Sequence, residues 1–143
     1  MATIEALLTD GFTVALSSSE GHEWTADEPR SMGGADLGPN PYELLLGALA
    51  ACTCITVSMY AQRNGWKLTS IQTRYDHDRV HARDCEECDD DRTGYIDRVR
   101  SSITIEGELD EAQRARLAEV AAACPVHKTL EKGVHIVDEV AFA

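Results

Sequence analysis

Five cysteines are the side chains of this sequence with the widest chemistry, and they fall into three groups. Cys52 and Cys54 lie two positions apart in the uncharged stretch GALAACTCITVSMYA, Cys85 and Cys88 form a C-x-x-C pair, and Cys124 precedes a proline. A cysteine can pack as a small apolar residue, ligate a metal, form a disulfide or, once deprotonated, act as a nucleophile. Each role requires different neighbours, so the surrounding sequence has to distinguish between them.

The cellular compartment limits what these thiols do. An odd number of cysteines excludes complete pairing within the chain, and the N-terminus MATIEALLTDGF has no basic segment followed by an apolar core. We therefore expect a cytoplasmic protein. In that reducing compartment a cysteine is more often catalytic, metal-binding or inert than a permanent cross-link.

Size and charge exclude some classes of partner. The 143 residues are most simply one domain over 1–143, and the formal net charge of -12 argues against binding to nucleic acid or to anionic membranes. The uncharged segment Leu44–Ala61 is at the lower limit of a membrane-spanning length, but it is rich in Ala, Gly, Thr and Ser. We interpret it as a helix that is apolar nearly all round and buried in a globular core.

The pattern of apolar residues predicts an α+β fold in which two main helices pack on antiparallel sheets, in the order β-β-β-α-β-β-α-β. Asp10-Gly11 indicates a hairpin turn, Asn40 is a helix N-cap with Pro41 at the first helical position, and Asp110 is a second cap. The expected strands cover 3–9, 12–18, 22–26, 68–82, 95–109 and 134–143, and the expected helices 41–62 and 111–124, with a short helical turn over 126–133.

The first two thiols cannot act together. Residues two apart on a helix point about 200° apart, so Cys52 and Cys54 face opposite sides and cannot bridge each other or share a tetrahedral metal. If the two predicted helices pack together, Cys52 or Cys54 could meet Cys124. From spacing alone, simple packing and redox chemistry both remain open for these residues.

The stretch GPNPYELLLGALAAC, followed far downstream by CPVHKTL, resembles the OsmC/Ohr family of osmotically induced and organic-hydroperoxide-resistance proteins. The resemblance implies an intertwined homodimer and a thiol-dependent peroxidase that reduces organic hydroperoxides or hydrogen peroxide in an oxidative stress response. It places the peroxide-attacking cysteine on Cys52 and the resolving cysteine on Cys124, and no catalytic role on Cys54. A dithiol reductant, lipoyl or similar, would reopen the resulting disulfide, and no cofactor would be required.

The sequence departs from this family at the groups that would activate the thiol. Peroxidase members use an arginine near the N-terminus and a glutamate directly after the N-P motif. Here Tyr42 follows the motif, the acid is Glu43, and no arginine precedes Arg30. Arg30 and Glu43 are the candidates, with Arg63 or His127 as substitutes for the arginine, and Glu43 is otherwise an ordinary first-turn helix charge. The alternative function is a module with the same fold that binds a small apolar ligand.

The segment HARDCEECDD raises a separate question. Cys85 and Cys88 have the spacing of zinc ligands, and His81, with His77 further upstream, could extend the ligand set. The alternatives are a second redox pair or two exposed thiols without a function. The adjacent acids favour the thiol over the thiolate and so disfavour reactivity. A zinc-binding structural protein built on Cys85, Cys88 and His81 is therefore a further hypothesis.

Overall fold

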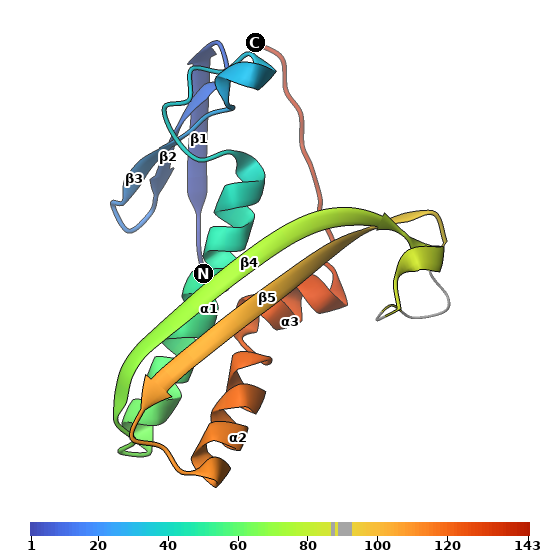
Figure 1. Ribbon diagram of the computed structural model, residues 1–143. Coiled ribbons are helices and arrows are strands. Elements are labelled where there is room, and N and C mark those ends of the chain that lie inside the picture. The colour runs from blue at the N-terminus through green and yellow to red at the C-terminus, as the bar shows by residue number, and fades with distance from the viewer. Residues whose placement is uncertain (87, 89–92) are drawn as a thin grey trace. The chain divides into compact units, whose positions relative to one another are not determined.

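The computed structural model describes residues 1–86, 88 and 93–143 (Figure 1). The chain divides into two compact units, Met1–Gly47 and Ala48–Ala143, and helix α1 (Pro41–Arg63) runs from one into the other. The elements are those of an α+β protein with antiparallel sheets, which confirms the expected fold class. The expected single domain over 1–143 stays a prediction.

The first unit is built on a three-stranded antiparallel sheet. Strands β1 (Ile4–Asp10), β2 (Thr13–Ser18) and β3 (Glu23–Ala26) pair in chain order. The turn between β1 and β2 lies where the sequence predicted it. Gly11 has a φ of 55° there, a left-handed conformation that glycine adopts without a steric penalty.

A buried carboxylate fixes the loop that follows this sheet. Asp27 is 2 % exposed and accepts a hydrogen bond of 2.8 Å from the Thr13 hydroxyl on β2. It also accepts the backbone N–H groups of Glu28 at 2.8 Å and of Ala35 and Leu37 at 3.3 Å. The carboxylate therefore replaces the backbone partners that a loop otherwise lacks, and it ties the loop to the sheet.

Two glycines let this loop approach other backbone closely. The loop contains the short 3-10 helix η1 (Arg30–Met32). A Cβ on Gly34 would lie 1.9 Å from the carbonyl oxygen of Glu28, and one on Gly38 would lie 2.1 Å from that of Thr25. Only glycine fits at either position, so the path of the loop is fixed by sterics as well as by the carboxylate.

Helix α1 begins and ends as the sequence indicates. The Glu43 N–H donates to the Asn40 side-chain oxygen at 2.9 Å, and the Asn40 N–H donates to a Glu43 carboxylate oxygen at 2.8 Å. This reciprocal pair is a capping box, which satisfies two donors at the start of the helix. The helix ends at Arg63, and Gly65 follows with a φ of 68°.

The second unit is a long two-stranded ribbon packed on helices. Strands β4 (Leu68–His81) and β5 (Tyr95–Gly107) are antiparallel, and helices α2 (Glu111–Ala121) and α3 (Pro125–Lys132) follow. In Figure 1, the end of the ribbon at which β4 ends and β5 begins lies away from α2. The core is formed by buried side chains of α1 and α2 and is covered by ribbon residues: Val57, Ala61, Leu117 and Ala121, with Ile71, Ile103 and Ile105 against them.

Two expectations were wrong. The alternating segment Val134–Ala143 forms no strand, and it is exposed, with Phe142 at 96 %. Helix α1 buries one i, i+4 stripe rather than its whole circumference, and Ile55 is 58 % exposed. The physical reason is shared, because a strand forms only where it pairs with another strand and an apolar face is buried only under a covering layer. Among the described residues, Val134–Ala143 pairs with no strand and Ile55 has no such cover.

The length and apolar composition of α1 alone would allow it to cross a membrane. Core helices of soluble proteins meet the same criteria, and Val57 and Ala61 of α1 are buried in the protein core. The helix therefore gives no indication of a membrane protein.

The Asp27 carboxylate makes the stability of the first unit depend on pH. Burial raises the pKa of Asp27, but the Thr13 hydroxyl and three backbone N–H groups together hold this pKa below its usual 3.8. A depressed folded-state pKa stabilises the protein above the unfolded value, and this contribution is lost as the pH falls through the folded-state pKa. We expect Asp27→Asn to lower the melting temperature at pH 7 by at least about 5 °C.

Thermal unfolding between pH 7 and pH 3 measures this effect. The melting temperature of Asp27→Asn should fall less steeply below pH 4 than that of the wild type. Asp138→Asn, in the exposed C-terminal segment, is the matched control and should follow the wild type. Parallel curves for wild type and Asp27→Asn would contradict this role of the carboxylate.

Candidate active site

Cys124 lies in a buried bend between two helices. It is 0 % exposed and has an extended backbone, with Pro125 at the first position of α3. Its sulfur caps α3 by accepting the His127 N–H at 3.4 Å. Proline suits the start of a helix because its missing N–H would have no intrahelical partner there. The C-P sequence thus directs the sulfur at the first free backbone donors of α3.

Helix α1 supplies the other contacts of this sulfur. The Thr53 hydroxyl donates to Cys124 Sγ at 3.5 Å, and the Cys52 thiol lies near enough to help lower the pKa of Cys124. Cys52 is half-buried, and its sulfur lies 4.0 Å from the Thr56 hydroxyl. The two cysteines implied by the family resemblance are therefore neighbours, and both are free thiols here.

The electrostatics of the site favour the anion of Cys124. Burial raises the pKa of this thiol, but hydrogen bonds from Thr53, from the backbone N–H groups of His127 and Val126 and from Cys52 outweigh burial. The net effect is a pKa below the usual value of 9.0. Donors that point at a sulfur favour its charged form. Cys124 is thus the thiol whose ionisation this site promotes.

A hydroxyl relay extends the site to the ribbon. Thr53 Oγ1 and the Tyr75 hydroxyl oxygen are 2.8 Å apart. The Thr53 hydroxyl has one proton and donates it to Cys124, so the Tyr75 hydroxyl must donate to Thr53. The hydrogen bonds thus run from β4 through α1 to the sulfur. Sequence reasoning missed both residues. The signal for Thr53 was available, because it is the polar member of the buried i, i+4 stripe Leu49, Thr53, Val57 and Ala61.

Cys54 has no place in this site. As its spacing from Cys52 predicts, it points elsewhere, and its sulfur lies 3.8 Å from the Thr73 hydroxyl on β4. Cys54 therefore packs between α1 and the ribbon as a small side chain that makes one weak polar contact.

Two cavities flank the hydroxyl and thiol network. One of about 380 Å³ is lined mainly by apolar residues, with Tyr75, Arg114 and His127 as polar groups. Another of about 310 Å³ also includes Tyr75 and His127. Neither cysteine is among the described residues that line them. The larger cavity is thus apolar with few polar groups, as in sites for small organic molecules, whereas the smaller one is also lined by Asp97 and Glu131.

The remaining candidates belong to the first unit. Glu43 uses its carboxylate to cap α1, which is the ordinary helix role considered above. Arg30 is exposed on η1 in the first unit, whereas Cys52 and Cys124 belong to the second. The activating roles of Arg30 and Glu43 stay predictions.

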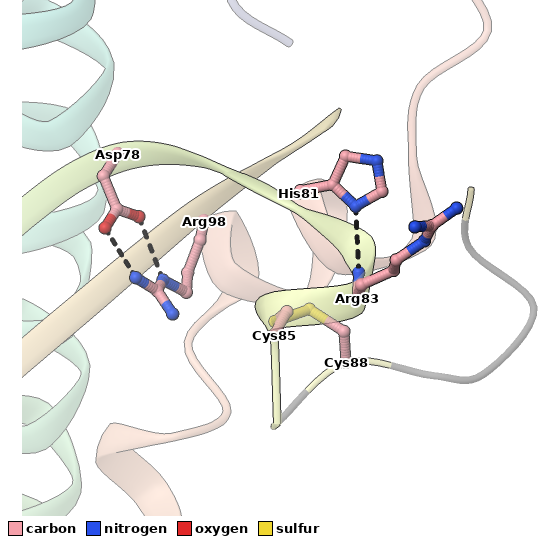
Figure 2. Close-up of a disulfide and its surroundings, with 6 residues drawn as sticks. All are labelled: Asp78, His81, Arg83, Cys85, Cys88 and Arg98. Atoms are coloured by element: carbon pink, nitrogen blue, oxygen red, sulfur yellow. Dashed lines mark hydrogen bonds and ion pairs between the residues drawn. A yellow bond between two sulfur atoms is a disulfide. The ribbon is translucent and has the colours of Figure 1, made fainter. Parts of the chain in front are cut away.

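The C-x-x-C pair is oxidised in this structure. Cys85 and Cys88 form a disulfide with a Cα–Cα distance of 5.4 Å (Figure 2). His81 Nδ1 accepts the Arg83 N–H at 3.2 Å, which leaves the ring proton on Nε2. Bonded sulfurs are not thiolate ligands, and no described group of three His, Cys, Asp or Glu side chains could hold a metal. Zinc binding by Cys85, Cys88 and His81 stays a prediction for the reduced protein.

The comparisons with known proteins agree with this geometry. Residues 33–137 match the model of the OsmC-like protein family. The chain belongs to the OsmC family. Its fold is similar to the solved structures of the OsmC-like protein of Mycoplasma pneumoniae (TM-score 0.69, 21 % identity, 92 % of this chain and 87 % of that one) and the organic hydroperoxide resistance protein OsmC of Legionella pneumophila (0.61, 19 %, 90 % and 87 %).

The fold is also similar to that of the organic hydroperoxide resistance protein OhrB of Bacillus subtilis, with a TM-score of 0.57 and 19 % identity over 90 % of this chain and 88 % of that one. No curated protein matches the sequence. The sequence identities are low, so these structures establish the OsmC fold of the chain and leave its activity to be proposed.

The Thr53 hydroxyl is the side-chain donor to Cys124 that can be removed with the least change of shape. Thr53→Val keeps the volume and deletes the hydrogen bond, so we expect the pKa of Cys124 to rise. Thiolate absorbance at 240 nm, measured against pH in a Cys52→Ala, Cys54→Ala background, reports this thiol alone among the free cysteines. Thr56→Val is the matched control. Equal titration midpoints for Thr53→Val and the control would contradict the role of Thr53.

Proposed function

We propose that this OsmC-family protein is a thiol-dependent peroxidase that reduces organic hydroperoxides, or hydrogen peroxide, with Cys52 and Cys124. The observation that carries the proposal is the proximity of the two thiols, through which Cys52 helps to lower the pKa of Cys124. The hydroperoxide-resistance names of the Legionella and Bacillus proteins of the same fold support it.

Exposure supports the attacking role that we propose for Cys52. Peroxide can reach a half-buried sulfur, whereas Cys124 is fully buried. When Cys124 is ionised, the two neighbouring cysteines carry one proton between them, on Cys52. Transfer of that proton from Cys52 to Cys124 leaves a Cys52 thiolate, which attacks the peroxide and breaks the O–O bond. Cys124 then returns the proton to the leaving alkoxide, and the products are an alcohol and a Cys52 sulfenic acid.

The stabilised anion of Cys124 serves the second step. This thiolate attacks the Cys52 sulfur, the S–O bond breaks, and hydroxide leaves and is protonated to water. A dithiol reductant, lipoyl or similar, would then attack the accessible Cys52 sulfur of the disulfide. Cys124 is a good leaving group because its hydrogen-bond donors hold its pKa below the usual value. The same hydrogen bonds thus assist both closure and reopening of the bridge.

The larger cavity beside the hydroxyl network favours substrates with apolar groups. It is lined by Ile103, Ile105, Leu109 and Leu117 among other residues. Such a lining would hold the hydrocarbon part of an organic hydroperoxide near the network. It also suits the alternative function, a binding module for a small apolar ligand with little peroxidase activity.

Assembly and location are part of the proposal. Helix α1 exposes Ile55 and Met59, and the C-terminal segment exposes Ile136 and Phe142. Apolar surface of this kind on two elements of a small protein suits burial by a second copy. We propose a cytoplasmic homodimer in which these surfaces are covered.

Substitution of each cysteine tests the peroxidase. With cumene hydroperoxide and dithiothreitol, we expect Cys52→Ser to lower turnover at least about 100-fold, because serine is not ionised at neutral pH. Cys54→Ser is the matched control on the same helix and should retain turnover within about twofold. Wild type that consumes no hydroperoxide, or equal losses in the two variants, would favour the ligand-binding alternative.

Arg30 is the proposed external cation of the site. If its guanidinium stabilises the Cys52 thiolate, Arg30→Ala should lower turnover about 10-fold at pH 7 and shift the pH–rate profile to higher pH. Arg30→Lys should restore part of the rate. A profile that is unchanged by Arg30→Ala would remove Arg30 from the mechanism and leave Thr53 and the α3 backbone as the groups that act on the thiol pair.

A further inference from the structure

The Cys85–Cys88 disulfide lies far from the thiol site along the ribbon. Tyr75 joins the Thr53 network, and β4 continues from there to His81 before the disulfide is reached. At about 3.3 Å per strand residue, Tyr75 and His81 are about 20 Å apart. Direct exchange between this disulfide and Cys124 of the same chain is therefore excluded without a rearrangement, and the bridge needs an explanation of its own.

The disulfide does not hold the ribbon together. The strands already pair up to His81 and Tyr95, and the Ala82 N–H donates to the Gly94 carbonyl at 2.8 Å. Further back, Arg98 donates two hydrogen bonds to the Asp78 carboxylate, as Figure 2 shows. The disulfide joins two cysteines that both follow β4 in the sequence, with a sequence separation of 3.

A bridge over so few residues removes little chain entropy from the unfolded state. The disulfide also does not link β4 to β5, so the stabilisation expected from it is small. This disulfide therefore contributes little to the stability of the fold. It can be reduced and reoxidised without disrupting the structure.

The two sulfurs differ in access. Cys85 is 7 % exposed, and its N–H donates to the Ala82 carbonyl at 3.4 Å. Cys88 is half-buried. Thiol–disulfide exchange requires a thiolate to approach one sulfur while the other leaves. The incoming thiol therefore attacks Cys88, and Cys85 is the leaving group held by the 3-10 turn η2 (Ala82–Asp84).

Charge limits the incoming thiol. The pair stands in the sequence DCEECDDD, with Arg83 as the nearest cation on the N-terminal side. An anionic thiol is repelled by such a segment, whereas a neutral thiol or one carried by a cation is not. The partner that fits is an uncharged or positively charged dithiol, either a small molecule or a group on a protein with a basic surface.

We propose that Cys85 and Cys88 form a second redox site, which accepts two electrons from such a dithiol. One thiolate of the dithiol attacks Cys88 Sγ, the Cys85–Cys88 bond breaks, and Cys85 leaves as a thiolate that takes up a proton. The second thiol of the dithiol then attacks its own partner sulfur in the mixed disulfide and releases Cys88. The dithiol is oxidised to a disulfide and the protein pair is reduced to two thiols.

The regiochemistry of exchange tests this proposal in the full-length wild-type protein. The oxidised protein is exposed briefly to cysteamine, a cationic monothiol, quenched with iodoacetamide, and mapped by peptide mass spectrometry. The expected product carries cysteamine on Cys88 and the alkyl group on Cys85, with at least about a 10-fold excess over the reverse product. Added salt should slow cysteamine and accelerate anionic 3-mercaptopropionate.

Three results would overturn the proposal. The first is that exchange occurs only after the protein is unfolded. The second is that reduction lowers the melting temperature by more than about 5 °C, as expected for a structural bridge. The third is that the reduced pair binds one zinc per chain and does not reoxidise with oxidised dithiothreitol. Cys52→Ser should exchange at Cys88 like the wild type. This variant keeps the test separate from the peroxidase, since either activity can fail without the other.

Discussion

The hydrogen bond from Thr53 to the buried sulfur of Cys124 is the contact on which the second unit depends. It joins the middle of α1 to the bend before α3, and the hydrogen bond between Thr53 and Tyr75 also ties β4 to α1. A buried polar group without a partner costs about 1–3 kcal/mol, so three elements are held in one arrangement by satisfying three polar atoms. The apolar core of Val57, Ala61, Leu117 and Ala121 continues along α1 and α2 from the same stripe.

This contact also determines the chemistry that the thiols can perform. Burial alone would leave Cys124 protonated and inert, whereas the donors of α1 and α3 reverse that preference. The accessible sulfur and the stabilised anion are thereby placed on different residues. In the proposed mechanism, Cys52 meets the substrate while Cys124 holds or returns the proton.

Local signals predicted most of the fold. The Asn40 and Asp110 caps, the Asp10-Gly11 turn and the period of the apolar residues located the helices and strands, because these features act within a few residues. The spacing of Cys52 and Cys54 correctly predicted that they face apart. Pairing of Cys52 with Cys124 came from family resemblance, since helix geometry gives the direction of a side chain but not the segment that packs against it.

The misses concern surfaces that need a second element. The alternating segment Val134–Ala143 has the sequence pattern of a strand, and α1 has the composition of a wholly buried helix. Pattern and composition indicate which structure a segment can form. Whether it forms also depends on another surface that packs or pairs with it. The oxidised Cys85–Cys88 pair was likewise open between metal and redox chemistry, because C-x-x-C spacing serves both.

The most direct measurement is the product of a single oxidation. Reductant-free protein is treated with one equivalent of cumene hydroperoxide, and its cross-links are mapped by peptide mass spectrometry without reduction. The account predicts a disulfide between Cys52 and Cys124, the loss of two free thiols per chain, and an unmodified Cys54. A Cys52 that is oxidised to sulfinic acid while Cys124 stays a free thiol, or a bridge that involves Cys54, would contradict it.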